Sequence, residues 1–557
     1  MKNATLVWLL GRIRRRIPAL VLMTLINVLQ ATLGVAFALG TRGVIDAAIS
    51  GRTRDLFVSA CLRQGSIILG LVLCTTLLRH IKERLSAQLD RDWKKDLLHG
   101  LFHADYAAIA RFHSGELLNR LNNDVRIVDD GLLSTIPNVA YFITKLVAAF
   151  AVLSVLEPWF ALIVLLAGGL VILVTGFMRR SLKMLNKRVA EEEGRVSGFL
   201  QESLEKLLMV QAMDVAGEME QRSDRLMADR FEVQRRRKNA SIFANSAVSA
   251  MSHCAAFAAL VWCSAGLLQG RISFGTLTAV TQLVNQLQSP LVSLSGVIPQ
   301  YISMIASAER LLELETLCSA QESSPVSPER FRDIRAIAAE ELSFAYDREQ
   351  IFNGASFCLP QGAFAVITGP SGTGKSTLLK LMLGVFHPEG GKLYLDCGGR
   401  QLPLDRDTRK AFSYVPQGNL LLSGTIRDNL IICKPDATEE EIRRAVYISC
   451  MDEYLPQLPR GLDTPLGESG AGLSEGQAQR LAIARGIISG APVLLLDEST
   501  SALDARTEQL VLERIRTLPG RTCIIVTHRP AAIALCDWNL EVRNGKILCH
   551  RIEKELN

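Results

Sequence analysis

A glycine-rich peptide, Gly369–Thr377 (GPSGTGKST), has the residue types and the spacing of a phosphate-binding loop. Its glycines allow backbone N–H groups to wrap around phosphate oxygens, and a helix that begins at the loop favours their negative charge. The ammonium of Lys375 can reach the terminal phosphates, and the hydroxyl of Ser376 can bind Mg²⁺. We therefore expect a nucleoside triphosphate to bind at Gly369, Pro370, Ser371, Gly372, Thr373, Gly374, Lys375, Ser376 and Thr377.

Groups suited to phosphate hydrolysis follow two later apolar segments. Asp497 and Glu498 come directly after Pro492–Leu496, and His528 follows Cys523–Val526 closely. A first carboxylate beside a phosphate-binding loop can hold magnesium, and the next can polarise a water molecule that attacks the γ-phosphate. His528 is a titratable hydrogen-bond partner for that phosphate. Asp497 is thus predicted as a metal ligand, and Glu498 and His528 as catalytic residues.

These residues need strands that bring them together. Ala363–Thr368, Pro492–Leu496 and Cys523–Val526 contain no charged residue, which is typical of buried strands. The loop lies between the first of these strands and an apolar helical pattern that starts at Leu378, and this order is that of a P-loop fold. We therefore expect an α/β domain that delivers the polar residues to one edge of its sheet.

A further peptide, Leu473–Gln477 (LSEGQ), lies between the phosphate-binding loop and the acidic pair and precedes a helical pattern. Here the chain resembles the ABC ATPases, whose signature peptide is of the LSGGQ type. The resemblance extends to the aromatic residue that stacks on adenine, the Q-loop, the D-loop and the H-loop, which match Tyr346, Gln417, Ser501–Asp504 and His528. It implies ATP and Mg²⁺ as the cofactors.

The resemblance also implies that two such domains work as a pair. In the family, the signature peptide of one subunit caps the ATP held by another, which implies nucleotide contacts for Ser474, Gly476 and Gln477. It implies that Gln417 is both a metal ligand and a catalytic residue. Glu475 departs from the family pattern, since glycine is commonest there. Because an acid at a helix N-terminus is favoured by about 0.3–1 kcal/mol, we expect Glu475 to be tolerated.

The composition of the whole chain indicates a membrane protein. Of its 557 residues, 48% are hydrophobic and only 21% are charged, and the mean hydropathy is +0.21, which excludes a disordered scaffold. The net charge of +6 is small for this length and gives no electrostatic case for a nucleic-acid partner. The 12 cysteines are scattered without a Cys-x-x-Cys pair, which favours neither a zinc site nor a disulfide framework.

The apolar excess lies in the N-terminal half, where six segments can cross about 30 Å of hydrocarbon at about 1.5 Å per residue. The predicted spans are Ile17–Thr41, Gln64–Leu78, Asn138–Leu156, Trp159–Met178, Asn239–Gly270 and Ile272–Ala308. Polar residues within them that could line a substrate path are Asn27, Gln30, Lys145, Asn245, His253, Gln282, Asn285, Gln286 and Gln288. For Lys145, a position in the cytoplasmic stem or at a membrane interface is an equal alternative. Hydrogen bonding between helices is favoured for the cluster in the last span.

Positive charges set the expected orientation. Arg12 and Arg14–Arg16 precede the first span, and cationic residues close to a membrane end favour the cytoplasmic side. The N-terminus, residues 80–136 and 179–238, and the ATPase domain are therefore expected in the cytoplasm, with the spans in a bacterial inner membrane. A secretory signal peptide is disfavoured, because the first apolar run exceeds the usual length of about 7–15 residues.

We expect an all-α transmembrane domain over residues 1–315, a linker over 316–331, where Ser, Pro and Glu are frequent, and an α/β P-loop ATPase domain over 332–557. In this order the chain resembles a half-transporter of the exporter-type (type IV) ABC family. The resemblance implies that Gly115–Asp124 (GELLNRLNND) is the first intracellular coupling segment, and that Leu466–Gln477 includes the loop before the signature.

The resemblance implies ATP-driven export of an amphipathic small molecule, peptide or lipid by alternating access in a dimer. Import of a siderophore-like ligand is the alternative, since some exporter-shaped members import such molecules. A non-transport ABC ATPase is disfavoured by the six spans. A homodimer is favoured over a heterodimer, because Lys375, Gln417, Glu498 and His528 are all present.

Overall fold

The computed structural model describes residues 2–49, 54–318, 331, 333–346, 349–418, 421–467, 470 and 472–553. The chain divides into two compact units. The helical unit comprises Met1–Phe102 and His113–Thr316, and the α/β unit comprises His103–Phe112 and Leu317–Asn557. Most of the predicted linker, residues 316–331, lies outside the described residues.

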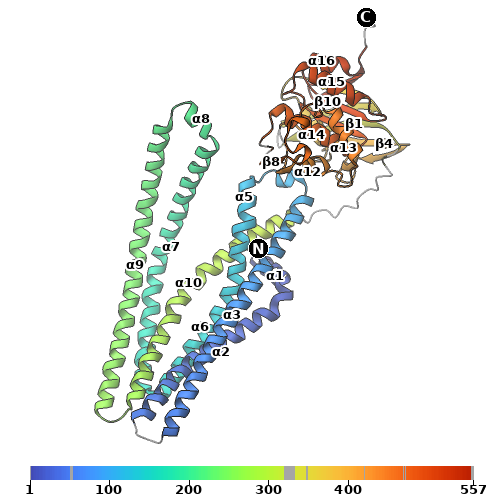
Figure 1. Ribbon diagram of the computed structural model, residues 1–557. Coiled ribbons are helices and arrows are strands. Elements are labelled where there is room, and N and C mark those ends of the chain that lie inside the picture. Colours follow the sequence, from blue (N-terminus) through green and yellow to red (C-terminus); the bar gives the residue numbers. More distant parts are fainter. Residues whose placement is uncertain are drawn as a thin grey trace. The chain divides into compact units, whose positions relative to one another are not determined.

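The helical unit consists of long helices joined by short ones (Figure 1). They are α1 (Lys2–Ile13), α2 (Ile17–Ile49), α3 (Arg54–His103), α5 (Ser114–Asn119), α6 (Val125–Leu156), α7 (Pro158–Glu205), α8 (Leu207–Ala212), α9 (Ala216–Leu268) and α10 (Phe274–Cys318). A π-helical turn, Arg120–Asp124, joins α5 to α6. Pro158 lies in the first turn of α7, where its missing N–H costs no hydrogen bond, and this explains why the chain breaks at Glu157 between α6 and α7.

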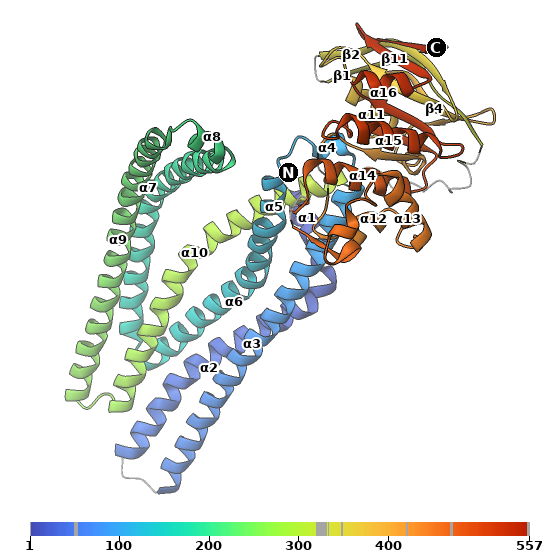
Figure 2. The same ribbon diagram turned by 45° about the horizontal axis from the view of Figure 1, so that its top comes forward.

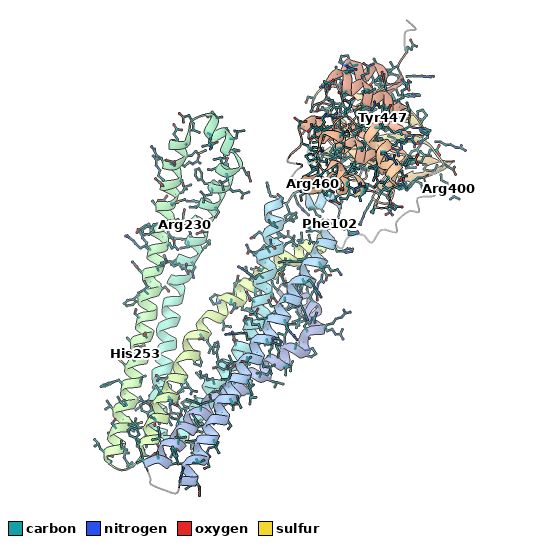
Figure 3. The ribbon with its side chains drawn as sticks, viewed as in Figure 1. Phe102, Arg230, His253, Arg400, Tyr447 and Arg460 are labelled. Carbon is teal, nitrogen blue, oxygen red and sulfur yellow. The ribbon has the colours of Figure 1, made fainter. Side chains whose placement is uncertain are left out.

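An apolar cluster joins α2, α6, α7, α9 and α10 close to the turn between α6 and α7. Its buried members are Val35, Ala38, Ala149, Leu153, Phe160, Ala161, Ala259, Cys263, Val280, Leu283, Val284 and Leu287. Several of these residues are small, which lets the helices approach closely. Helices α7 and α9 lie side by side (Figures 1 and 2), and Arg230 Nε of α9, labelled in Figure 3, is 2.6 Å from Glu193 Oε2 of α7.

Four helical stretches in the described part of the chain are long and apolar enough to cross a membrane. They are Ala4–Ile49, Arg54–His103, Ser114–Leu156 and Ser249–Leu268. These stretches contain the first three predicted spans and the last part of the fifth. The fourth and sixth predicted spans, 159–178 and 272–308, fall in α7 and α10, where several side chains lie outside the described residues.

A buried ionic cluster ties the π-helical turn to α10. Asp124 is 1% exposed and accepts hydrogen bonds from Ser307 Oγ at 2.9 Å and Arg310 Nε at 2.8 Å. Arg120 is 5% exposed, and its Nη1 lies 3.0 Å from Glu313 Oε2 and donates to the carbonyl oxygen of Arg310. Because buried charges are costly unless paired, this cluster fixes the start of α6 against α10.

The α/β unit contains two main sheets, with strand orders β2-β1-β4-β5 and β12-β11-β3-β10-β9-β6, and the pair β7-β8. The strands are β1 (Ile334–Tyr346), β2 (Glu349–Pro360), β3 (Phe364–Thr368), β4 (Gly390–Cys397), β5 (Arg400–Pro403), β6 (Phe412–Val415), β7 (Gly424–Thr425), β8 (Pro465–Leu466), β9 (Val493–Asp497), β10 (Thr522–Val526), β11 (Trp538–Arg543) and β12 (Lys546–Arg551). The helices are α4 (Tyr106–Ile109), α11 (Lys375–Met382), α12 (Ile426–Ile431), α13 (Glu439–Ile448), α14 (Glu475–Ile488), α15 (Ala505–Arg516) and α16 (Pro530–Leu535). Helices α12, α13 and α14 lie away from strands β1, β2 and β4 in this unit (Figure 2).

The six-stranded sheet aligns the ends of its central parallel strands. Ile367 of β3 pairs with Val526 of β10, Val526 pairs with Asp497 of β9, and Val415 of β6 pairs with Leu496 of β9. All residues of β9 and β10 are buried, as the uncharged sequences predict. The segments that follow β3, β6, β9 and β10 therefore start at one edge of the sheet, where ligands bind in such folds.

The segment His103–Phe112 follows α3 in the chain but belongs to the α/β unit. Arg406 Nη1 donates to the carbonyl oxygen of His103 at 2.5 Å, and the ring of Tyr106 lies 6.3 Å from that of Phe386 at an angle of 78°. Asp105 caps α4, because its carboxylate accepts a hydrogen bond from the backbone N–H of the second residue of the helix. This segment of the N-terminal half therefore packs within the α/β unit.

The stretch Gly115–Asp124, which the resemblance implies is the first intracellular coupling segment, lies in the helical unit, and its coupling role stays a prediction. That stretch forms α5 and the π-helical turn inside the helical unit. Its charged residues Arg120 and Asp124 are buried against α10, so the motif specifies packing within the helical unit. The segment that joins the α/β unit, His103–Phe112, ends just before the motif.

Candidate nucleotide site

The phosphate-binding loop connects β3 to α11. Gly369, Gly372 and Gly374 have φ angles of +145°, +80° and +100°, which side chains rarely allow. A Cβ atom on Gly374 would lie 2.3 Å from Ile351 Cγ2. The Nζ atom of Lys375 donates to the carbonyl oxygen of Gly369 at 2.9 Å, so the loop holds a positive charge beside the start of a helix. This arrangement suits phosphate oxygens.

Asp497, at the end of β9, is held by two hydroxyl groups. Its Oδ1 accepts a hydrogen bond from Ser376 Oγ at 3.0 Å, and its Oδ2 accepts one from Tyr414 OH at 3.1 Å. Burial raises the pKa of Asp497, which is 3% exposed, and the two hydrogen bonds oppose this rise. Burial and the nearby carboxylate of Asp497 also raise the pKa of Tyr414, so its hydroxyl stays a donor at neutral pH.

Glu498 takes an unusual backbone conformation at the edge of the sheet. Its φ angle is +47°, and its N–H donates to the carbonyl oxygen of Val526 at 3.0 Å. Gln417 Nε2 donates to Glu498 Oε2 at 2.7 Å. A non-glycine residue in this conformation costs about 1–3 kcal/mol and is typical of functional sites. The carboxylate of Glu498 therefore contacts the segment that follows β6 through Gln417.

The oxygen atoms at this edge fit Mg²⁺, which prefers hard oxygen ligands. The hydroxyl of Ser376 and the carboxylate of Asp497 are already in contact. The hydrogen bond of Gln417 uses its amide nitrogen, which leaves the amide oxygen suited to a metal. Ser376, Asp497 and Gln417 thus provide a hydroxyl, a carboxylate and an amide oxygen from three segments of one sheet edge.

An aromatic cluster surrounds Tyr346, the residue expected to stack on adenine. The ring of Tyr346 lies 5.0 Å from that of Phe344 and 5.3 Å from that of Phe386, and both pairs meet edge to face. Phe386 in turn contacts Tyr106 of α4. A continuous set of ring contacts therefore runs from Tyr346 to the segment that follows α3. His528, the other predicted contact to the nucleotide, is exposed just after β10.

The predicted signature residues form the start of α14. Ser474 caps this helix, and Ser474 and Gln477 exchange two hydrogen bonds between side chain and backbone, a capping box. A Cβ atom on Gly476 would lie 3.0 Å from the carbonyl oxygen of Ala502, so glycine allows the D-loop to pack closely. Glu475 is exposed in the first turn of the helix, where its charge is favoured, as expected.

The D-loop is held from both sides. Gln479 Oε1 of α14 accepts a hydrogen bond from the N–H of Ala502 at 3.0 Å, and Arg529 Nη1 donates to the carbonyl oxygen of Leu503 at 2.7 Å. Arg529 also pairs at 3.0 Å with Glu508 of α15, which is 1% exposed. The signature helix, the D-loop and the residue after His528 therefore form one polar network.

Hydrogen bonds join Ser376 to Asp497 and Gln417 to Glu498, whereas the structure shows no direct bond from His528 or Tyr346 to these groups among the described residues.

Sequence reasoning missed four residues with clear structural roles at the site: Tyr414, Gln479, Arg529 and Phe386. A hydroxyl in the short buried strand before Gln417 could have indicated Tyr414. The roles of the other three depend on tertiary contacts that no local pattern shows.

Two family matches together cover more than half of the chain. Residues 20–291 match the ABC transporter transmembrane region, and residues 352–501 match the ABC transporter family. The chain therefore belongs to the ABC transporter superfamily. Because both regions lie in one chain, it is an exporter-type half-transporter and an integral membrane protein, as the motifs and apolar segments predict.

Several relatives have names that state a cargo. The chain is 27% identical to an ATP-dependent lipid A-core flippase of Desulfotalea psychrophila, over 86% of this chain and 83% of that protein. It is 29% identical to a fatty acid ABC transporter ATP-binding/permease protein of Mycobacterium bovis, over 78% of this chain and 69% of that protein. It is 41% identical to the mycobactin import protein IrtB of Mycobacterium tuberculosis, over 38% of this chain and 37% of that protein.

The fold is also that of a solved transporter. The structure of a bacterial Atm1-family ABC exporter with ATP bound matches 96% of this chain and 94% of its own, with a TM-score of 0.78 and 25% identity. The predicted fold class, a helical transmembrane domain followed by an α/β ATPase domain, is confirmed.

Proposed function

We propose that this chain forms half of a dimeric pump that uses ATP hydrolysis to export an amphipathic small molecule, peptide or lipid across a bacterial inner membrane. The observation that carries the proposal is the hydrogen bond between Gln417 and Glu498 beside the pair of Ser376 and Asp497. The residues that we propose as base, metal ligands and phosphate loop follow strands that end at one sheet edge, in a chain that also carries helices long and apolar enough to cross a membrane.

Each residue at the edge has a defined task in the proposed hydrolysis. Lys375 and the loop glycines bind the β- and γ-phosphates of ATP. Bound Mg²⁺ neutralises charge on the phosphates. Gln417 orients the carboxylate of Glu498, which polarises the attacking water molecule and takes up its proton. His528 donates a hydrogen bond to the γ-phosphate.

The ring contacts supply a route from the nucleotide to the membrane helices. We propose that Tyr346 stacks on adenine, so a change in its position alters the contact between Phe386 and Tyr106. Tyr106 lies in the segment that directly follows α3, a helix that contains a predicted span. Movement at the adenine site can therefore act on the membrane part of the chain through the residues 103–112.

The proposed pump is a dimer with two working sites. Ser474, Gly476 and Gln477 lie at the exposed start of α14, where backbone N–H groups favour an anion. We propose that they cap the ATP held by a second copy of the chain. With Lys375 and Glu498 present in each copy, a homodimer can hydrolyse ATP at both sites, and a heterodimer is the alternative. The N-termini and the ATPase domains lie in the cytoplasm.

The test uses Glu498→Gln in the full-length chain, purified and reconstituted in proteoliposomes. ATP hydrolysis should fall by about 10²–10⁴-fold, since the base is lost, while ATP binding is retained and ATP-driven movement of a labelled lipid or peptide stops. Glu513→Gln is the matched control, because Glu513 is exposed on α15 and contacts only the nearby Gln509 in the described structure. Normal hydrolysis in Glu498→Gln would contradict the assignment of the base.

Import of a siderophore-like ligand is a second candidate, favoured by the similarity of part of the chain to a mycobactin importer. The direction of transport separates the two. In proteoliposomes whose ATPase units face outward, an exporter accumulates its substrate in the lumen when ATP is added outside, whereas an importer releases substrate that was loaded in the lumen. Release of the loaded substrate, without accumulation of added substrate, would show that the protein is an importer and not an exporter.

A further inference from the structure

Lys145 is a basic residue inside a helix that is apolar enough to cross a membrane. It precedes Glu157, where α6 ends, by 12 residues, which is about 18 Å of helix at about 1.5 Å per residue. The hydrocarbon core is about 30 Å thick. With the outer surface of the membrane taken to lie at the end of α6, the Cα of Lys145 lies near the middle of the hydrocarbon core, away from the interface and from the cytoplasmic stem that the sequence left as alternatives.

The exposed face of α6 lies on the side of the helix opposite to Lys145. Ile136, Ile143 and Val147 are 54%, 51% and 60% exposed, and their spacing puts them on one apolar stripe. Lys145 is two residues from both Ile143 and Val147, which is about 160° around a helix of 3.6 residues per turn. Lys145 is thus turned away from the stripe that suits lipid.

The opposite side of α6 faces the helix bundle. Ala149 and Leu153 are fully buried in the apolar cluster with α2 and α10, and Leu146 packs against the same cluster. Lys145 lies one turn before Ala149 on the same side and is itself half-buried. Its charge therefore points into the bundle of a transporter, where ionisable residues mark substrate or ion paths.

The neighbours of Lys145 leave its charge unbalanced. Its Nζ donates to Tyr141 OH at 3.3 Å and lies 5.4 Å from the centre of that ring. A cation on an aromatic face gains only about 0.5–2 kcal/mol. Among the described residues, no carboxylate pairs with Lys145, and the hydroxyl proton of Tyr141 has no acceptor. Two donors, an ammonium and a phenol, are therefore available within 3.3 Å of each other.

We propose that Lys145 and Tyr141 bind the anionic group of the transported molecule, a carboxylate or phosphate on an apolar body. This inference rests on the proposed transport function and narrows its substrate class to amphipathic anions. Two oxygen atoms of one carboxylate or phosphate group can accept from the ammonium and the phenol together, and charge-assisted hydrogen bonds of this kind are the strong ones. The anion also supplies the missing countercharge inside the bundle.

The experiment compares four molecules that share one hydrocarbon tail. Palmitate and cetyl phosphate carry the two anionic groups, cetyl alcohol is neutral, and cetyltrimethylammonium is a cation. Each is measured for equilibrium binding to the purified full-length protein and for stimulation of ATP hydrolysis in phosphatidylcholine vesicles, whose lipids carry no net charge. We expect at least one anion to bind and stimulate, and the alcohol and the cation to bind at least about ten-fold more weakly.

Three variants assign the effect to the proposed site. Lys145→Met should weaken binding of the anion by about ten-fold or more, and Lys145→Arg should restore most of it. Tyr141→Phe should weaken it less, since one neutral donor is lost. Lys82→Met is the matched control. Lys82 of α3 donates to Ser134 of α6 in the predicted cytoplasmic part of these helices, so the variant should bind the anion as the parent does.

The outcomes separate this inference from the transport function. Stimulation by palmitate alone or by cetyl phosphate alone identifies the carboxylate or the phosphate as the recognised group. Equal binding of the alcohol, or unchanged anion binding in Lys145→Met, would overturn the site even if ATP-driven transport is observed. Anion binding that depends on Lys145 in a protein that moves no substrate would retain the site and overturn the proposed function.

Discussion

Tyr414→Phe tests whether the phenol of Tyr414 controls the metal site. In the structure its O–H is one of only two side-chain donors to Asp497 among the described residues, the other being Ser376. A hydrogen bond to a charged group contributes about 1.5–3 kcal/mol. Loss of a partner that orients a metal ligand costs about 10–100-fold in metal affinity. The free energy of the hydrogen bond and the loss of metal affinity agree, because about 1.4 kcal/mol corresponds to a ten-fold change in an equilibrium constant. The Mg²⁺ concentration that gives half of the maximal ATPase activity should therefore rise by about 10–100-fold in Tyr414→Phe.

The pH dependence of the same variant has a defined sign. Burial raises the pKa of Asp497, and the bond from Tyr414 opposes that rise. Removing the bond therefore moves the pKa further up, and the carboxylate is protonated at a higher pH than in the parent. Because a metal ligand must be deprotonated, the loss of ATPase activity on acidification should begin closer to neutral pH in Tyr414→Phe.

The assay is ATP hydrolysis by the full-length protein, titrated with free Mg²⁺ at several pH values. Tyr394→Phe is the control, because Tyr394 OH also donates to a carboxylate, Glu340 Oε1 at 2.6 Å, but in the antiparallel sheet. It makes the same chemical change away from the edge that holds Asp497. The reasoning is refuted if Tyr414→Phe keeps the Mg²⁺ and pH dependence of the parent, or if Tyr394→Phe shifts both equally.

Three further predictions concern other parts of the α/β unit. Lys375→Ala should weaken ATP binding, and undiminished affinity in a nucleotide-binding assay would contradict the phosphate-loop assignment. Glu475→Gly should change the rate of ATP hydrolysis only a few-fold, a change of under about 1 kcal/mol in the activation free energy, because Glu475 is exposed at the start of α14. A complete loss or a large gain of activity would show that its charge acts on the nucleotide. Phe386→Leu removes ring contacts worth about 0.5–1.5 kcal/mol each. The ratio of substrate-stimulated to basal ATP hydrolysis should therefore fall. An unchanged ratio would exclude the ring contacts to Tyr106 as a coupling route.

The sequence was enough to predict which segments end at the same edge of the six-stranded sheet, because the sequence patterns that identify these segments are local. Uncharged strands, a glycine-rich loop and an acidic pair each occupy a few consecutive residues, and the register of β3, β10 and β9 then aligns them. The partner of Asp497 could not be predicted in this way. Tyr414 reaches that carboxylate only because β6 lies next to β9, and the neighbour of a strand is a property of the whole fold.

The packing of the predicted coupling segment also depends on tertiary contacts. Gly115–Asp124 carries a recognisable motif, but its charges satisfy one another and α10 inside the helical unit. The docking of residues 103–112 depends on Tyr106 and Phe386, single aromatic residues far apart in the sequence that belong to no periodic pattern. A motif identifies where a family resemblance lies, whereas the packing of its residues depends on tertiary contacts.

The inclusion of His103–Phe112 in the α/β unit has a consequence for biosynthesis. The ribosome makes this segment before Phe386, so Tyr106 has no Phe386 ring to contact while residues 113–385 are being synthesised. A truncated fragment that begins at β1 never receives the segment, and one side of the Phe386 ring is left without its partner. Soluble fragments intended for crystallisation or inhibitor screening should therefore be supplied with residues 103–112, either fused or as a separate peptide.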